Sequence, residues 1–268
     1  MELKTAILVD GSYFVNRTNY FKRKYFSEQG DLTALHYIGI LQGIIRRHLS
    51  SEGAKNHSQY YLYRTFYYDS PPLDLRIHKP FCEEGETNKR IQDFSTLPEN
   101  RCRKELLKGL QTQRKVALRL GTIKHQKKWK LKDRTVQDLL KGELSIDELG
   151  NSNFYFDSQQ KGVDIKLGLD IATLAYEKLV DQIILIAGDS DFVSAAKLAR
   201  MKGIDFVLDS LRGNIDPSLN EHIDGLNSFD LVSIISKVIG SQPDVKPTWW
   251  DDVKPENSVT KPNKKRIG

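Results

Sequence analysis

The pattern that most constrains the fold is an alternation of short apolar runs with amphipathic segments of helical length. The apolar run at 182–187 is followed by a segment at 191–203 with apolar residues at helical spacing, and then by a second apolar run at 204–210. In the N-terminal half we expect strands at 5–10 and 60–70 and a helix at 32–48. Strands that alternate with helices indicate a parallel sheet covered on both faces. The predicted fold class is therefore α/β.

The segment from about 73 to 155 departs from this pattern and is basic. Residues 101–141 hold 14 Lys or Arg against three Asp or Glu, a net charge of +11, whereas the rest of the chain holds 27 basic and 32 acidic residues. Such a run is often only a solvated face, but this asymmetry favours a polyanionic partner. The candidates for contacts to a nucleic-acid backbone are Lys127, Lys128, Lys130 and Arg134.

The chain is expected to form one domain at 1–240, with the basic segment as an insertion, and a tail at 241–268. The tail holds four of the nine prolines and many charged residues, which predicts that it is disordered or loosely docked. Trp249 and Trp250 are costly to expose to water, so they either pack back onto the body or dock a protein partner. The sequence is also compatible with a homo-oligomer.

Several features bear on the cellular compartment. No apolar run approaches the roughly 20 residues of a membrane span, so no membrane association is expected. The N-terminus enters a strand at once, so we expect no signal peptide. Cys82 and Cys102 lie far apart, which argues against a disulfide framework and against a metal-binding cysteine pair. We therefore expect a cytoplasmic protein.

Two carboxylates, Asp189 and Asp191, directly follow an expected buried strand in the stretch ILIAGDSDF. For one aspartate, capping of the next helix is the simplest explanation. In an open parallel sheet, however, ligands bind beyond the carboxyl ends of the strands, where the strand order reverses. Asp10 ends the first expected strand and Asp164 precedes another expected helix, so both could reach the same cleft. Capping does not readily explain Asp10, because its DGSYF stretch need not begin a helix.

Four carboxylates in one cleft would repel one another, and a divalent cation would relieve that repulsion. Mg²⁺ and Mn²⁺ prefer carboxylate and water ligands. A metal held in this way lowers the pKa of a bound water and stabilises charge on a phosphate oxygen, which is the chemistry of phosphodiester hydrolysis. Ser12 and Ser190 could donate hydrogen bonds to a phosphate or to one of the carboxylates.

Three stretches, ILVDGSYF, KGVDIKLGLDIATLA and ILIAGDSDFVSAAKLARMKG, resemble the core motifs of the NYN family within the PIN-like nuclease superfamily, in its LabA-like branch. YRTFYYDSPP also resembles that family's second strand region. The resemblance implies a three-layer, Rossmann-like PIN domain and a metal-dependent ribonuclease. By position, it carries the family's acidic centre onto Asp10, Asp164, Asp189 and Asp191.

Two positions in these motifs need comment. Asp170 falls on the family pattern but lies six residues from Asp164, which is not same-face spacing in a helix. We therefore expect Asp170 to support a ligand or to have a structural part. Tyr13 stands where relatives commonly have Asn, so any ligand or backbone-fixing role of that position does not carry over.

The sequence thus predicts an endoribonuclease that hydrolyses RNA, single-stranded or structured, with Mg²⁺ or Mn²⁺ held by the four aspartates. The alternative is a catalytically silent RNA-binding or regulatory module of the same fold, but a pure RNA binder gains nothing from a repelling acidic pocket. A phosphatase or nucleotide-binding protein is a third reading. The sequence contains no glycine-rich phosphate-binding loop, which disfavours it.

Overall fold

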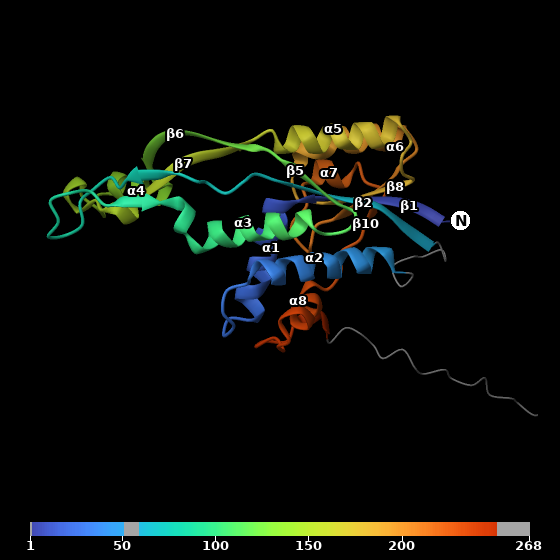
Figure 1. The fold of residues 1–268 in the computed structure, drawn as a ribbon, viewed down its shortest axis with the longest axis horizontal. Helices are drawn as coiled ribbons and strands as arrows, with labels where there is room; N and C mark the ends of the chain where they lie inside the picture. Colours follow the sequence, from blue (N-terminus) through green and yellow to red (C-terminus); the bar gives the residue numbers. More distant parts are fainter. Residues whose placement is uncertain (1, 51–58, 251–268) are drawn as a thin grey trace, which may run out of the picture.

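A computed structural model describes residues 2–50 and 59–250, and within them a six-stranded sheet forms the centre (Figure 1). Its strand order is β10-β9-β8-β1-β2-β5, and every neighbouring pair is parallel. The strands are β1 (Glu2–Asp10), β2 (Gln59–Asp69), β5 (Val116–Leu120), β8 (Gln182–Ile186), β9 (Asp205–Asp209) and β10 (Gly225–Leu226).

The strand order reverses between β1 and β8. From β1 the chain moves outward through β2 to β5, and it then returns to the other side of β1 and moves outward again through β8, β9 and β10. Val9 of β1 pairs with Ile186 of β8, so the two strands end at the same level. This is the arrangement in which a doubly wound sheet opens a crevice for ligands.

Helices cover both faces of the sheet, as Figure 1 shows. One layer contains α1 (Gly11–Tyr25), α2 (Ala34–Leu49), α3 (Pro98–Gln111) and α8 (Leu231–Ile239), and the other contains α5 (Val163–Tyr176), α6 (Val193–Met201) and α7 (Pro217–Asn220). Successive side chains of β1 point toward opposite helical layers, because the side chains of a strand alternate between the two faces of the sheet. Ile7 and Val9 join the first core, and Ala6 and Leu8 join the second. The expected three-layer α/β fold is confirmed.

Part of the basic segment projects from this body as an arm, which comprises residues 76–97 and 122–161. It contains β3 (Arg76–His78) paired with β4 (Ile91–Asp93), β6 (Thr122–Leu131) paired with β7 (Phe154–Lys161), and α4 (Asp133–Lys141). Its own core is aromatic: the Phe156 ring centroid lies 5.0 Å from that of Phe94 and 5.6 Å from that of Trp129. By contrast, α3 and β5 belong to the body, so the arm consists of two separate stretches of the chain.

Helix α1 corrects one expectation. The DGSYF stretch does begin a helix, because α1 starts at Gly11 directly after β1 and Asp10 is its N-cap. A Cβ at position 11 would lie 2.6 Å from the Tyr67 ring, so glycine is what allows the chain to turn into the helix so close to β2. The sequence signal was the buried row of Phe14, Thr18, Phe21 and Tyr25, which repeats at helical spacing.

The described part of the tail packs onto the body. The ring of Trp249 meets those of Phe21 and Tyr25 edge to face, and the Trp250 indole donates a hydrogen bond of 2.5 Å to Asp230. The tryptophans therefore pack back, as one of the two sequence readings expected. The expectation of a disordered or loosely docked tail covered all of 241–268, and its larger part, residues 251–268, lies outside the described residues. A protein partner bound through the tail stays a prediction. No helix within the described ranges is both long and apolar enough to span a bilayer.

Candidate active site

Asp10 is the last residue of β1, at the point where the strand order reverses between β1 and β8, and this region is called the crevice below. Asp10 is half-buried, and its Oδ1 accepts a hydrogen bond of 3.0 Å from the backbone N–H of Tyr13. Burial raises the pKa of Asp10 above its ordinary value, and the charges of Asp164 and Asp69 raise it further, although the Tyr13 N–H acts in the opposite direction. Asp10 therefore caps α1 and also belongs to a cluster of like charges.

The other three predicted carboxylates surround the same crevice and are exposed. Asp164 lies in the first turn of α5, while Asp189 and Asp191 follow β8. Partial burial raises the pKa of the Asp164 carboxyl, and the charges of Asp191 and Asp189 add to the effect. Because Asp164 also raises the pKa of Asp10, it electrostatically links the two sides of the cluster. The charges of the four residues therefore form a chain of interactions from Asp10 through Asp164 to Asp189 and Asp191, and their role as ligands stays a prediction.

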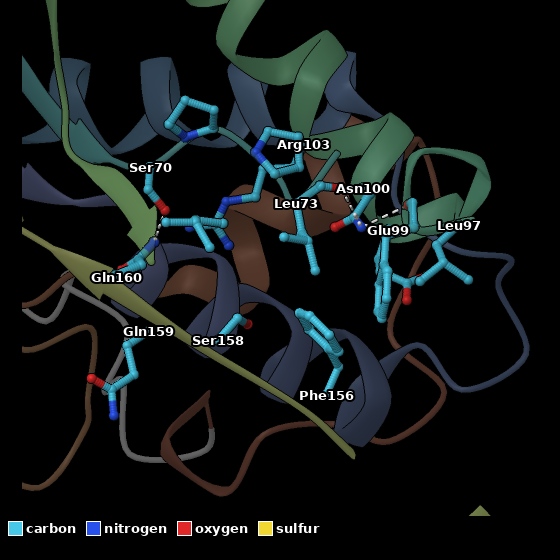
Figure 2. Close-up of a pocket in the computed structure, with 14 residues that line it drawn as sticks. Ser70, Leu73, Leu97, Glu99, Asn100, Arg103, Phe156, Ser158, Gln159 and Gln160 are labelled. Atoms are coloured by element: carbon cyan, nitrogen blue, oxygen red, sulfur yellow. Dashed lines mark hydrogen bonds between the residues drawn. The ribbon is translucent and has the colours of Figure 1, made fainter. Parts of the chain in front are cut away.

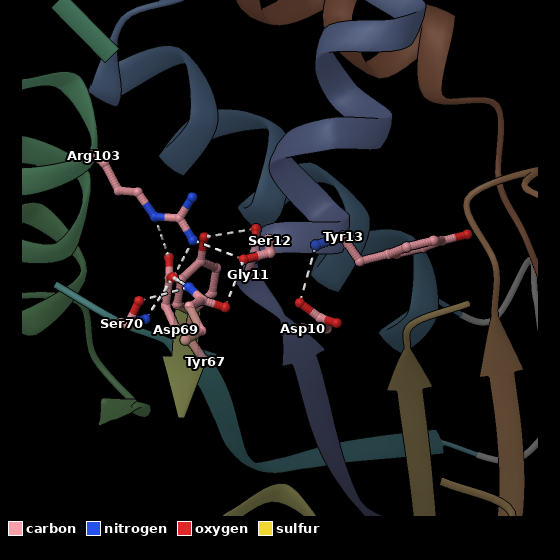
Figure 3. A network of polar contacts seen from close by, with 9 residues as sticks. Asp10, Gly11, Ser12, Tyr13, Tyr67, Asp69, Ser70 and Arg103 are labelled. Carbon is pink, nitrogen blue, oxygen red and sulfur yellow. Dashed lines mark hydrogen bonds and ion pairs between the residues drawn. The ribbon is translucent and has the colours of Figure 1, made fainter. Parts of the chain in front are cut away.

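The loop that carries Asp189 and Asp191 is held by Tyr13. A Cβ at position 188 would lie 2.5 Å from the Tyr13 ring, so this ring lies against Gly188. The Tyr13 hydroxyl donates a hydrogen bond of 2.5 Å to the carbonyl of Ser210, and Figure 3 shows the side chain extending across the ends of the neighbouring strands. Burial raises the pKa of Tyr13 to about 12, so the hydroxyl stays protonated at neutral pH. Tyr13, the departure from the family pattern, thus fixes the loop beside the acidic cluster.

The Asp189 carboxylate also has a local role. Its Oδ1 accepts a hydrogen bond of 3.2 Å from the N–H of Asp191 and closes the turn that leads to α6. The capping explanation therefore holds for the turn itself. It does not exclude the cation-binding explanation, since a carboxylate oxygen has more than one lone pair.

The chemistry of the cluster fits a hard divalent cation, because carboxylate oxygens are its only charged donors. Among the described residues, no group of three or more His, Cys, Asp or Glu is closely enough arranged to hold a metal ion as it stands. Burial is the main cause of the raised pKa values of Asp10 and Asp164, and the neighbouring carboxylates add to it without a compensating cation. A bound cation would lower both.

Beside the acidic cluster lies a polar network that sequence reasoning missed (Figure 3). Asp69 ends β2, is fully buried, and forms an ion pair with Arg103 in which Nε and Oδ2 are 3.0 Å apart. The Arg103 Nη2 also donates to Ser12 Oγ at 2.9 Å. Gln160 donates to Asp69 at 3.2 Å and to Ser70 Oγ at 2.6 Å. The network thus joins α1, β2, α3 and the arm near the carboxyl end of β2.

Two of the supporting residues predicted from the sequence can be placed. Ser12 belongs to the polar network, since it contacts Arg103 and also donates to Gln160 at 3.3 Å. Asp170 accepts hydrogen bonds from the Tyr68 hydroxyl at 2.8 Å and from Arg119 at 2.7 Å, which is a structural role. The side chain of Ser190 lies outside the described residues.

The four predicted basic residues lie on the arm and not in the crevice. Lys130 pairs with Asp157 at 2.8 Å, and Arg134 lies 3.9 Å from Asp138. Lys127 and Lys128 are exposed in β6. Ile123 of β6 pairs with Gln160 of the polar network. Lys127 is four residues beyond Ile123 in β6, which is roughly 13 Å further from the network at about 3.3 Å per residue. Lys127 and Lys128 could therefore contact nucleic acid beyond the crevice, while Lys130 and Arg134 already have acidic neighbours.

The acidic cluster predicts a pH-dependent response to divalent cations. The folded state of Asp10 and Asp164 holds a proton more tightly than the unfolded chain, so their contribution to stability falls as the pH rises above about 4. Millimolar Mn²⁺ should therefore raise the melting temperature at pH 7, by the equivalent of about 2.7 kcal/mol at 100 times its Kd. The shift should shrink near pH 4, where protons compete with the cation.

Thermal melts of matched variants test this response. Asp164→Asn should reduce the Mn²⁺ shift at pH 7, whereas Asp147→Asn, an exposed carboxylate of the arm, should retain it. A wild-type melting temperature that does not respond to millimolar Mn²⁺ would argue directly against a cation site.

Comparison with known proteins finds a match to one family model. Residues 105–219 match the family model of the NYN domain, a stretch that runs from α3 to α7 and includes Asp164, Asp189 and Asp191 but not Asp10. The uncharacterised protein y4oD of Sinorhizobium fredii is 28% identical over 79 residues, which are 28% of this chain and 37% of that protein. The chain therefore matches only about a third of the length of this relative.

A crystal structure of a protein of unknown function from Vibrio parahaemolyticus is also similar. It is 14% identical, the match covers 85% of this chain and 93% of that one, and the TM-score is 0.37. At this level the similarity carries no argument. The match to the NYN family model and the parallel sheet with its flanking helices both agree with the resemblance of the sequence motifs to the NYN domain of PIN-like nucleases.

Proposed function

We propose that this protein is a metal-dependent endoribonuclease whose acidic centre consists of Asp10, Asp164, Asp189 and Asp191. The observation that supports the proposal is the placement of these carboxylates near the reversal of strand order, where the charge of Asp164 raises the pKa of Asp10 and the charges of Asp191 and Asp189 raise that of Asp164. A structural role alone does not require four like charges around one crevice.

In this proposal the aspartates hold Mg²⁺ or Mn²⁺, which supplies an acidified water and charge stabilisation for the scissile phosphate. The residues of the chain position the other groups. Tyr13 keeps the loop with Asp189 and Asp191 in place, and the Asp10 cap fixes the start of α1. Arg103 orients the Ser12 hydroxyl, while its charge is paired with the buried Asp69.

The catalytically silent RNA-binding module remains the alternative, and it is favoured by the absence of a ready-made cation geometry among the described residues. Incubation of end-labelled RNA with the protein separates the two. A nuclease should produce internal cuts with Mn²⁺ or Mg²⁺ and none with a chelator, and Asp10→Asn should remove the cuts. Binding of RNA without any metal-dependent cleavage would favour the silent module.

A further inference from the structure

A cavity lies between the arm and the body, next to the acidic centre (Figure 2). Its volume is about 310 Å³. The body contributes Ser70, Leu73, Asn100 and Arg103, and the arm contributes Phe94, Ile123, Phe156, Ser158, Gln159 and Gln160, among others. The arm therefore forms one wall of the cavity. The basic residues predicted to contact nucleic acid, Lys127, Lys128, Lys130 and Arg134, are not part of this wall.

The cavity adjoins the acidic centre through shared residues. Ser70, Arg103 and Gln160 line it and also form the polar network with Asp69 and Ser12. Asp69 in turn lies close enough to raise the pKa of Asp10. A phosphate in the crevice and a group in the cavity can therefore belong to one and the same ligand chain.

The lining combines an apolar surface with hydrogen-bonding groups. Leu73 and Phe156 point into the cavity in Figure 2, and Phe94 is half-buried in its wall. The amide nitrogen of Asn100 donates to the carbonyls of Phe94 at 2.8 Å and Leu73 at 3.4 Å, which fixes the orientation of this side chain. Its Oδ1, like the Ser158 hydroxyl, makes no hydrogen bond to the described residues, so both can pair with a ligand.

We infer that this cavity binds the base of one unpaired nucleotide of the RNA whose phosphate lies in the crevice, so that the substrate is single-stranded where it is cut. A base has an apolar face for the leucine and phenylalanine side chains and polar edges for Asn100 and Ser158. The volume is at the lower end for a ligand pocket and suits one such ring system. A paired base cannot enter, because its partner strand would meet the walls. The inference rests on the proposed function for the phosphate, but its own evidence is the cavity.

The test compares two short oligomers of equal length and charge in the presence of a chelator: oligouridylate, and the same ribose-phosphate backbone without bases. The full-length protein should bind the base-free backbone at least about tenfold more weakly, since stacking of a base on an aromatic surface contributes about 1–3 kcal/mol. It should also prefer a single strand to the same strand annealed to its complement.

Ser158→Glu places a carboxylate in the mouth of the cavity and should weaken binding of oligouridylate until the two oligomers bind alike. Ser158→Asp is a second, smaller variant at the same cavity residue if the first does not fold. Ser152→Glu adds the same charge on an exposed arm residue outside the cavity and should retain the tenfold difference. Joint Lys127→Ala and Lys128→Ala substitution should weaken both oligomers by the same factor.

Equal binding of the two oligomers by the wild type, or a base preference that persists in both cavity variants, would overturn the inference. Because the chelator removes cleavage, this outcome is independent of turnover. A base preference without metal-dependent cleavage would support base binding in the cavity and contradict the proposed nuclease activity. Metal-dependent cleavage without a base preference would support the nuclease activity and contradict base binding in the cavity.

Discussion

Asp189→Asn should reduce single-turnover cleavage of RNA by at least about two orders of magnitude while leaving the protein folded. The substitution removes one negative charge from the proposed cation site, and cation positioning matters most in the transition state. It keeps the side-chain oxygen that accepts the Asp191 N–H, so the unfolding free energy should change by no more than roughly 1 kcal/mol. RNA binding should be retained or improve, because a charge that repels phosphate is gone.

Asp216 offers a matched control for this variant. Its Oδ1 accepts the N–H of Ser218, two residues further on, at 2.8 Å, which is the same local bond that Asp189 makes, but Asp216 is at the start of α7. Asp216→Asn should therefore cleave RNA normally. Near-normal cleavage by a folded Asp189→Asn protein would mean that this carboxylate only closes its turn.

Arg103→Met should destabilise the protein by about 3 kcal/mol, because it leaves the Asp69 carboxylate buried without a cation. Asp69 is completely buried and the Arg103 side chain is 25% exposed, so in this variant water can solvate the unpaired Asp69 carboxylate only in part. At roughly 2–4 °C per kcal/mol for a chain of this size, the melting temperature should fall by about 6–12 °C. Addition of Asp69→Asn to this variant should recover part of the loss, since it removes the unpaired charge.

The control is another ion pair between an arginine and an aspartate of the body, Arg119 with Asp170. Arg119 and Asp170 are 37% and 22% exposed, so Arg119→Met should cost only about 1 kcal/mol. Thermal or denaturant unfolding measures both variants. Equal losses for Arg103→Met and Arg119→Met would show that the Asp69 pair contributes no more than a surface pair.

Most of the body could be predicted from the sequence because its strands are apolar on both faces and its helices are amphipathic. The runs that form β1 and β8 end on aspartates, and the rule for parallel sheets then predicts that Asp10 and Asp189 meet at one crevice. Helix α1 was missed because its buried row includes Thr18 and the rest of the helix is polar. The cap formed by Asp10 was missed with it.

The polar network around Asp69 could not be predicted from the sequence for a different reason. Asp69 is the last residue of β2, just as Asp10 is the last residue of β1. The rule that ligands bind beyond the carboxyl ends of parallel strands could therefore have identified Asp69 as a candidate site residue. Its partner Arg103 stands in the basic segment, where composition indicated a solvated or nucleic-acid-binding surface, and only the packing of α3 against the body turns it inward. Gln160 carries no sequence signal, because its contacts depend on the register of β6 and β7.

The position of β1 in the sheet has a consequence for the newly made chain. β1 is synthesised before its neighbour β8, which begins about 170 residues later, and Asp164 and Asp189 are made close to β8. At roughly 5–20 residues per second, this edge of β1 waits about 10–35 s on the ribosome for its partner. For most of that interval the nascent chain carries Asp10 without the other three carboxylates. The acidic cluster therefore cannot assemble before synthesis has passed Asp191.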